Sequence, residues 1–213
     1  GEEEEGEESM SSLELAGTIA VSVGLAVLLF VVLPTGAMKL LQNEGFSPMV
    51  LNLCEGLLRL GIFLLYIWGI SRQKDIQRVF QYHGAEHKTI YTYEHGLPLR
   101  VENVRPFSTL HPRCGTNFLM IVMLISIFIF TFLGWPSLWE RILSRILLMP
   151  VVAGISYEII RFAGKHMDKP WVRAAILPGL ALQKLTTRQP DDDQIEVAIA
   201  SLKAVLPPEE IIE

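Results

Sequence analysis

The residues best suited to chemistry in this chain are histidines gathered in one short segment. Four of the five histidines lie within residues 83–111, and His83 and His87 are four residues apart. Residues 72–93 have the pattern of a helix, on which side chains four apart share one face. Two imidazoles so placed can bind one metal ion. The spacing predicts a metal site, and Glu94 would lie within about 20° of the same face if the helix extends that far.

A second group of candidate ligands lies directly before a long apolar stretch, where His111 and Cys114 are three residues apart. A cytoplasmic thiol stays reduced, and thiolate with imidazole is a borderline-soft ligand set that prefers zinc. The sequence therefore predicts a tetrahedral zinc site with the ligands His83, His87, His111 and Cys114. In the alternative interpretation this segment only starts a helix, with Thr116 or Asn117 as its cap and Cys114 as a packing residue.

The role of this metal has two interpretations. In the first, a structural zinc with four protein ligands fastens the histidine-rich loop to the helices of a membrane scaffold or assembly factor. The alternative is a zinc-dependent membrane hydrolase of peptides or lipid headgroups. Glu86 completes the order His-x-x-Glu-His of inverted zinc peptidases, so Glu86 or Glu94 would be its general base. An open coordination position would favour the hydrolase.

Three other charged residues are candidates for function. Arg113 lies among basic residues that we interpret mainly as determinants of topology, with binding of anionic lipid headgroups as a second role. Glu158 and Arg161 are one helical turn apart near the end of the last apolar stretch. Ionisable residues in such stretches are candidates for function, although a structural ion pair is the commoner outcome.

The elements that must position these residues are those of a membrane protein. The chain has 213 residues, of which 50% are hydrophobic, and its mean hydropathy is +0.36, which disfavours a soluble globular enzyme. A membrane-crossing helix needs about 20 mostly apolar residues. Four stretches qualify and predict an all-α protein with four transmembrane helices: 15–33, 51–70, 117–134 and 142–164.

Individual residues predict further details of two of these stretches. The first should end at Pro34, which is followed by Thr35 and Gly36. In the second, Glu55 and Arg59 are four residues apart and can pair on the helix face that points into the bundle.

Lysine and arginine predict the orientation, because cytoplasmic loops carry the excess of these residues. Residues 71–116 contain seven and the tail after residue 164 contains six, whereas the two other loops contain one each. We expect both termini and the loop 71–116 to be cytoplasmic. The net charge of −5 comes from glutamates near the start of the chain, so it indicates no partner.

The chain should divide into three parts: an acidic tail at 1–14, a transmembrane domain at 15–164 that includes the loop 71–116, and a cytoplasmic segment at 165–213. In the last part, apolar residues at helical spacing predict a short amphipathic helix over about 190–206, with Pro190 in its first turn. Residues 171–185 suit a segment lying in the membrane interface.

Several sequence runs resemble those of the YqhQ-like family of bacterial membrane proteins. They are Tyr82–Lys88, Glu102–Pro106, His111–Asn117, Pro178–Leu180, Leu185–Arg188 and Pro190–Asp192. The resemblance implies residence in the bacterial membrane and a shared polar loop. We separately expect the lipid bilayer and a membrane protein or a second copy as partners, and we expect no nucleic acid. The resemblance supplies no activity. Members of the family carry a further N-terminal segment rich in glycine and methionine, so we expect an N-terminal part to precede this chain.

Overall fold

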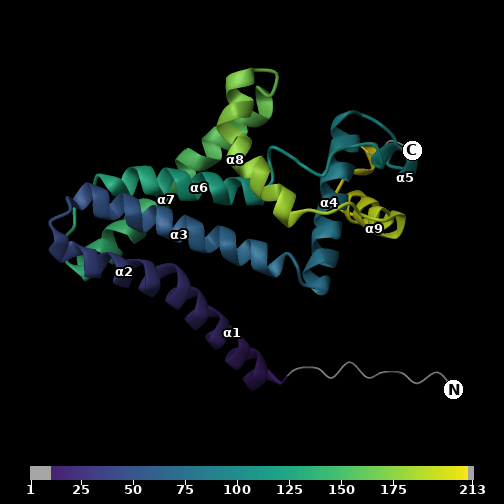
Figure 1. Ribbon diagram of the computed structural model, residues 1–213. Coiled ribbons are helices and arrows are strands. Elements are labelled where there is room, and N and C mark those ends of the chain that lie inside the picture. Colours follow the sequence, from purple (N-terminus) through teal and green to yellow (C-terminus); the bar gives the residue numbers. More distant parts are fainter. Residues whose placement is uncertain (1–10, 211–213) are drawn as a thin grey trace.

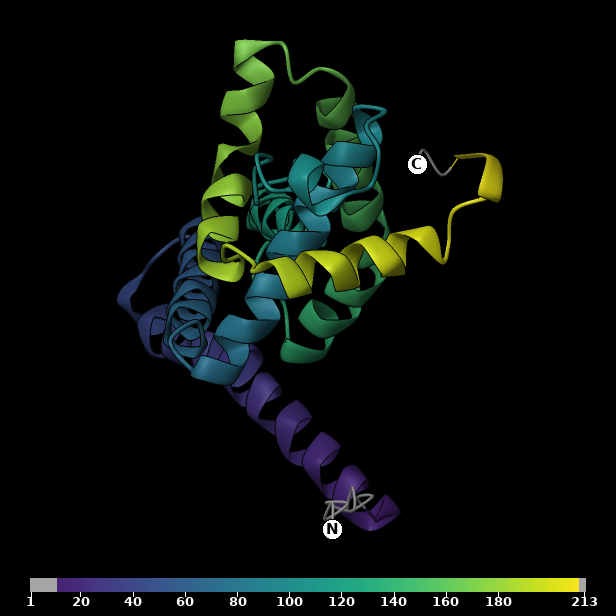
Figure 2. The same ribbon diagram turned by 90° about the vertical axis from the view of Figure 1, so that its right-hand side faces the viewer.

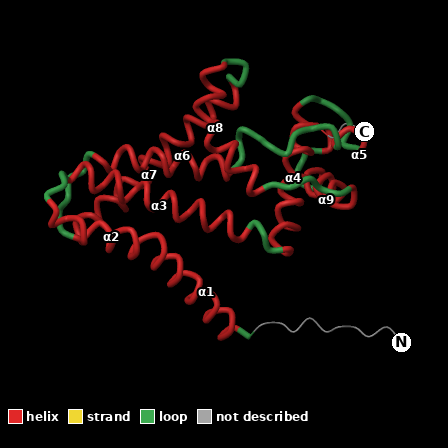
Figure 3. The backbone as a smooth tube through the Cα atoms, viewed as in Figure 1, coloured by secondary structure: helices red, strands yellow, loops and turns green. Residues whose placement is uncertain are grey.

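The computed structural model describes residues 11–210, and within this range every regular element is helical (Figures 1 and 3). Three helices are long and apolar enough to cross a membrane: Ser12–Leu41, Pro48–Ile70 and Leu138–Lys165. The predicted all-helical class is confirmed, together with these three candidate spans. Of the predicted acidic tail, residues 1–10 lie outside the described residues, and residues 12–14 begin the first helix.

The helix expected as a further span is α6 (Gly115–Thr131), which is apolar but has only 17 residues. At a rise of about 1.5 Å per residue it is roughly 25 Å long, slightly less than a hydrocarbon core of about 30 Å. The structure therefore gives three helices of full spanning length and a shorter apolar one.

The first helix does not end at Pro34, so that prediction is wrong. It runs through α1 (Ser12–Val27), a π-helical turn (Leu28–Val32) and α2 (Leu33–Leu41). Pro34 has no N–H to donate to the carbonyl of Phe30, four residues earlier. The π-turn lies at this point, and Nε of Arg59 donates to the Phe30 carbonyl at 2.7 Å. Since a side chain from the next helix satisfies that carbonyl, the helix continues past the proline.

Three further helices pack around α6. They are α3 (Pro48–Ile70), α7 (Leu138–Lys165) and α8 (Pro170–Thr186), each of which contacts α6 (Figure 1). Ile121 of α6 packs against Ile160 of α7 and against Val172 and Ile176 of α8. The segment predicted to lie in the membrane interface is thus a helix with one face buried on the bundle.

At the far end of α3 the chain forms a small helical head, composed of α4 (Lys74–Glu94), α5 (Val101–Val104) and α9 (Asp192–Lys203). In Figure 2, α9 lies across α4. Ala85, Val104, Ile195 and Ile199 belong to the core of the head. The predicted amphipathic helix near the C-terminus is confirmed.

The start of α9 differs from the prediction in the position of Pro190. Its N-cap is Asp191, whose side chain accepts a hydrogen bond from the Gln194 amide, so Pro190 precedes the cap instead of lying in the first turn. Two short 3-10 turns complete the described chain, at Gln42–Glu44 and Pro208–Glu210.

Candidate metal centre

Helix α4 and the start of α6 bring three of the predicted ligands together. His83 and His87 lie one turn apart on α4, with ring centroids 4.4 Å apart. Nε2 of His83 is 3.2 Å from Sγ of Cys114. One ligand atom from each of His83, His87 and Cys114 lies within 4.8 Å of the other two. This spacing is short enough for all three to bind a single ion.

Both histidines are held by backbone carbonyls from other parts of the chain. Nδ1 of His83 is 2.8 Å from the carbonyl oxygen of Thr186, and Nδ1 of His87 is 2.5 Å from that of Thr109. A carbonyl oxygen only accepts hydrogen bonds, so each Nδ1 must carry the proton and donate. In the neutral rings, Nε2 is therefore the nitrogen with a free lone pair. This arrangement is typical of histidines that bind metal through Nε2.

Cys114 is the N-cap residue of α6, and its Sγ accepts a hydrogen bond from the Thr116 amide at 3.3 Å. Burial alone would raise the pKa of this thiol. When no metal is bound and Nε2 of His83 and His87 carries a proton, hydrogen bonds from these rings and from Thr116 to the sulfur outweigh burial and lower the pKa to about 5. For His83 burial has the opposite sign and would lower the pKa of the ring. Hydrogen bonds with Cys114 and the Thr186 carbonyl outweigh it, so the pKa of His83 is raised. The thiolate, which is the form that binds metal, is therefore favoured at neutral pH.

His111, the fourth predicted ligand, lies next to this group but is oriented differently. Its Nδ1 accepts from the Arg113 amide at 3.3 Å, and its Nε2 is 3.4 Å from Oε2 of Glu94. The ring centroid is 5.7 Å from that of His87. Both ring nitrogens of His111 are thus engaged, and it stands outside the three-residue group.

The backbone of His111 is fixed by a residue that the sequence did not point to. The side-chain amide of Gln183, on α8, accepts from the His111 amide and donates to the His111 carbonyl, both at 2.8 Å. Gln183 is fully buried. A single glutamine in a predicted interfacial segment carries no sequence signal of such a role.

The three candidate ligands are among the residues that line an open cavity of about 560 Å³. Glu86 and Glu94 also line it, as does Arg113, which forms an ion pair with Glu94. Helix α4 extends as far as Glu94, so the predicted alignment of Glu94 with the histidine face is realised. The cavity therefore combines candidate metal ligands with two carboxylates and a guanidinium group.

Glu158 and Arg161 do form an ion pair, with Arg161 Nη1 3.5 Å from Glu158 Oε1. Both side chains are largely exposed, and neither lines the cavity. Of the two interpretations of this pair, the contacts favour the structural ion pair.

Comparison with known proteins places the chain in a family. The model of a family described as a protein of unknown function (DUF1385) matches residues 1–208. The chain belongs to this family. It is 45% identical over 152 residues to the uncharacterized protein YqhQ of Bacillus subtilis (strain 168), a match that covers 71% of this chain and 48% of the relative. The predicted resemblance is confirmed, and the chain spans about half the length of this relative. No solved structure matches the chain.

Proposed function

We propose that the protein is a multi-pass membrane protein that binds one zinc ion through His83, His87 and Cys114 and uses it for hydrolysis. The observation that carries this proposal is the convergence of the three ligand atoms within 4.8 Å at the edge of an open cavity. One thiolate and two imidazoles suit zinc, whose catalytic sites commonly have three protein ligands and one open position.

The open position favours a catalytic metal over a closed structural one. Both ring nitrogens of His111 have other partners, so it offers no fourth bond in this arrangement. Zinc lowers the pKa of bound water, and the general base must reach that water without binding the metal. Because Glu94 is paired with Arg113, Glu86 is the better candidate for this base. Arg113 would then steady the negative charge that develops in the transition state.

A structural zinc is the second candidate, and it is favoured because the ligands come from two different parts of the fold. His83 and His87 belong to α4, whereas Cys114 caps α6, so an ion bound by all three would fasten the head to the bundle. In that case the protein would be a scaffold or assembly factor, and Glu86 would have no chemical role.

The membrane arrangement that we propose has four spans, with α6 as the third. Exposed Phe132 and Leu133 follow α6 directly and lengthen its apolar stretch. An even number of crossings also places α4 and α9 on the same side of the membrane, which suits their mutual packing. The distribution of lysine and arginine supports a cytoplasmic location for that side.

The test of metal binding is the zinc content of the detergent-purified full chain. We expect about one zinc per chain, and its loss from the double variant His83→Ala, Cys114→Ala, because removing two ligands costs most of the affinity. The matched control is His95→Ala, an exposed histidine just after α4 whose ring donates a hydrogen bond to the Tyr91 carbonyl and lies outside the candidate site. Wild-type protein without zinc, or the double variant with stoichiometric zinc, would contradict the proposal.

Glu86→Gln separates the two roles of the metal. A catalytic site predicts that this variant keeps its zinc and its melting temperature but loses hydrolysis of peptide and lipid-headgroup substrates. A structural site predicts full cellular function in Glu86→Gln, together with a lower melting temperature when a chelator removes the zinc.

A further inference from the structure

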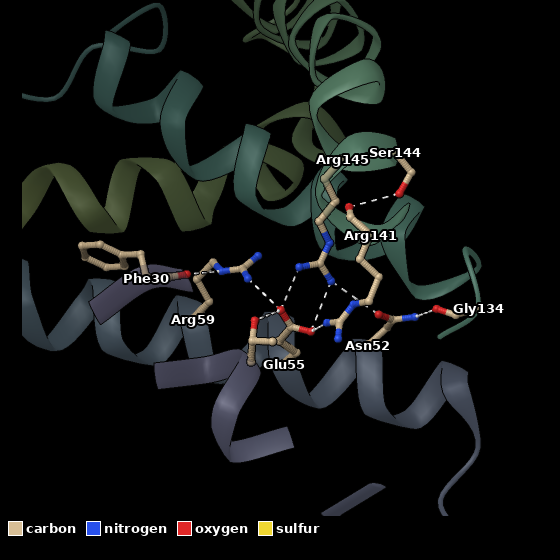
Figure 4. Close-up of polar contacts among 9 residues, drawn as sticks. Phe30, Asn52, Glu55, Arg59, Gly134, Arg141, Ser144 and Arg145 are labelled. Carbon is tan, nitrogen blue, oxygen red and sulfur yellow. Dashed lines mark hydrogen bonds and ion pairs between the residues drawn. The ribbon is translucent and has the colours of Figure 1, made fainter. Parts of the chain in front are cut away.

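At the opposite end of α3 from the candidate metal centre, three arginines converge on one carboxylate (Figure 4). Glu55 forms ion pairs with Arg59 of its own helix and with Arg141 and Arg145 of α7. The pairing of Glu55 with Arg59 was predicted from their spacing. Because Glu55 is the only acidic partner of these arginines in the described chain, the cluster retains two positive charges.

The carboxylate of Glu55 has no room for further donors. Its Oε1 accepts from Arg59 at 2.8 Å, from Arg145 at 2.8 Å and from the Thr35 hydroxyl at 3.1 Å. Its Oε2 accepts from both Arg141 and Arg145. A guanidinium group carries several N–H donors, so the arginines have more donors than Glu55 can satisfy.

One of the remaining donors is buried without a partner. The side chain of Arg141 is 8% exposed, and its Nε has no hydrogen-bond acceptor among residues 11–210. Its guanidinium also lies 3.7 Å from the centre of the Trp135 ring, which favours the cation but accepts no strong hydrogen bond. Excess positive charge on buried and partly buried arginines, with one unpaired donor, would be stabilised by an anion.

The structure provides space for such an anion. A cavity of about 340 Å³ is lined by all three arginines of the cluster. The rest of its lining is mainly apolar and comes from the first helix, from α7 and from Phe130 of α6; it includes Val31, Leu138, Ile146 and Met149. These four side chains are exposed on the outside of helices long enough to cross a membrane. The ligand should therefore carry hydrocarbon next to its negative charge.

The position of the cluster along the membrane-spanning helices also suits an anion that carries hydrocarbon. Glu55 and Arg145 each lie seven residues after the first residue of their helix, which places them roughly 10 Å from its end. From this depth the long arginine side chains can reach the region where lipid headgroups meet the hydrocarbon layer.

We propose that this cluster binds the phosphate group of an anionic phospholipid, with Arg59, Arg141 and Arg145 around the phosphate and the acyl chains along the apolar residues of α7. The proposal depends on the membrane arrangement described above but not on zinc. Loss of zinc in His83→Ala, Cys114→Ala should therefore leave lipid binding unchanged, which keeps the two proposals separately testable.

The test is native mass spectrometry of the detergent-purified full chain titrated with phosphatidylglycerol or phosphatidylcholine. We expect clear preference for phosphatidylglycerol and roughly fivefold weaker binding in Arg59→Gln, which removes one positive charge at the cavity. The matched control is Arg161→Gln on α7, which removes an exposed arginine outside the cluster and should bind like the wild type.

Three results would overturn the proposal. They are equal binding of the two lipids by the wild type, unchanged phosphatidylglycerol binding by a folded Arg59→Gln variant, and complete competition by inorganic phosphate, which would indicate a free anion. The first and third need no variant, so the proposal remains testable even if Arg59→Gln does not fold.

Discussion

The carbonyl oxygen of Arg188 lies against Gly84 so closely that a Cβ atom on Gly84 would overlap it. The amide of Arg188 also donates to the carbonyl of Phe80 at 2.8 Å, which joins the segment after α8 to the backbone of α4. Two residues before Arg188, the Thr186 carbonyl accepts from His83. The glycine between the two histidines therefore lets a distant segment reach and orient a candidate ligand.

Gly84→Ala should disturb this contact. Because backbone atoms cannot give way as a flexible side chain can, we expect a loss of about 1–3 kcal/mol in unfolding free energy and weaker zinc binding through misplacement of His83. Thermal unfolding and zinc content of the purified chain measure both effects. Gly61→Ala is the matched control, since nothing lies within 4 Å of a Cβ there, and the better helix former should be neutral or slightly stabilising. Equal behaviour of the two variants would contradict the importance of this contact.

Local sequence patterns predicted the helices and the pair of histidines on one helix face. They could not predict the hydrogen-bond partners of these histidines, which lie far away in the sequence. The four-residue spacing of His83 and His87 was enough to place both on one face of α4. It contained nothing about Thr109 or Thr186, because any residue can offer a backbone carbonyl. Gln183 was missed for a related reason, since in the described part of the chain its side chain forms hydrogen bonds to the backbone of His111 alone.

Within the bundle, Pro34 and the charges around Glu55 show the same limit of prediction from local sequence. Pro34 predicted the end of a helix, but an arginine 25 positions later satisfies the carbonyl that the proline leaves free. Likewise, the spacing of Glu55 and Arg59 predicted their pair, while the approach of Arg141 and Arg145 depends on how α7 packs beside α3.

The thiol of Cys114 should react as a thiolate well below neutral pH. Its pKa is lowered to about 5, so in metal-free Cys54→Ala protein the alkylation rate with iodoacetamide should stay nearly constant between about pH 8 and pH 6 and fall near pH 5. Because the pKa is lower in the folded protein than in the unfolded chain, the thiolate also stabilises the fold. This contribution to the unfolding free energy is fully present above the pKa of the unfolded thiol and is lost as the pH falls towards 5. In His83→Ala the profile should shift to higher pH because a hydrogen bond to the thiolate is lost. A rate that rises steadily from pH 6 to pH 8 in the parent would contradict this prediction.

Ile195 should hold α9 on α4. Its side chain is 2% exposed and belongs to the core that includes Ala85 and Val104. We expect Ile195→Ala to cost about 2–5 kcal/mol of unfolding free energy, because it removes buried methyl groups and leaves a cavity. Hydrogen exchange should show faster exchange in α9 and α4 than in α6. Val197→Ala, on the exposed side of α9, should change stability by no more than about 0.5 kcal/mol; an equal effect of both substitutions would show that the buried face does not hold the helix.

The orientation in the membrane predicts which introduced cysteines an impermeant maleimide will label in intact cells. Leu97 and Glu196 are exposed in the head, which the excess of lysine and arginine predicts to be cytoplasmic. Glu44 is exposed in the turn between the first helix and α3, at the opposite end of the bundle. In a Cys54→Ala parent, Glu44→Cys should therefore be labelled from outside, and Leu97→Cys and Glu196→Cys only after the membrane is permeabilised. The parent itself corrects for any reaction of Cys114. Labelling of Leu97→Cys from outside would reverse the orientation, and different sidedness for Leu97→Cys and Glu196→Cys would contradict the even number of crossings that the packing of α9 on α4 requires.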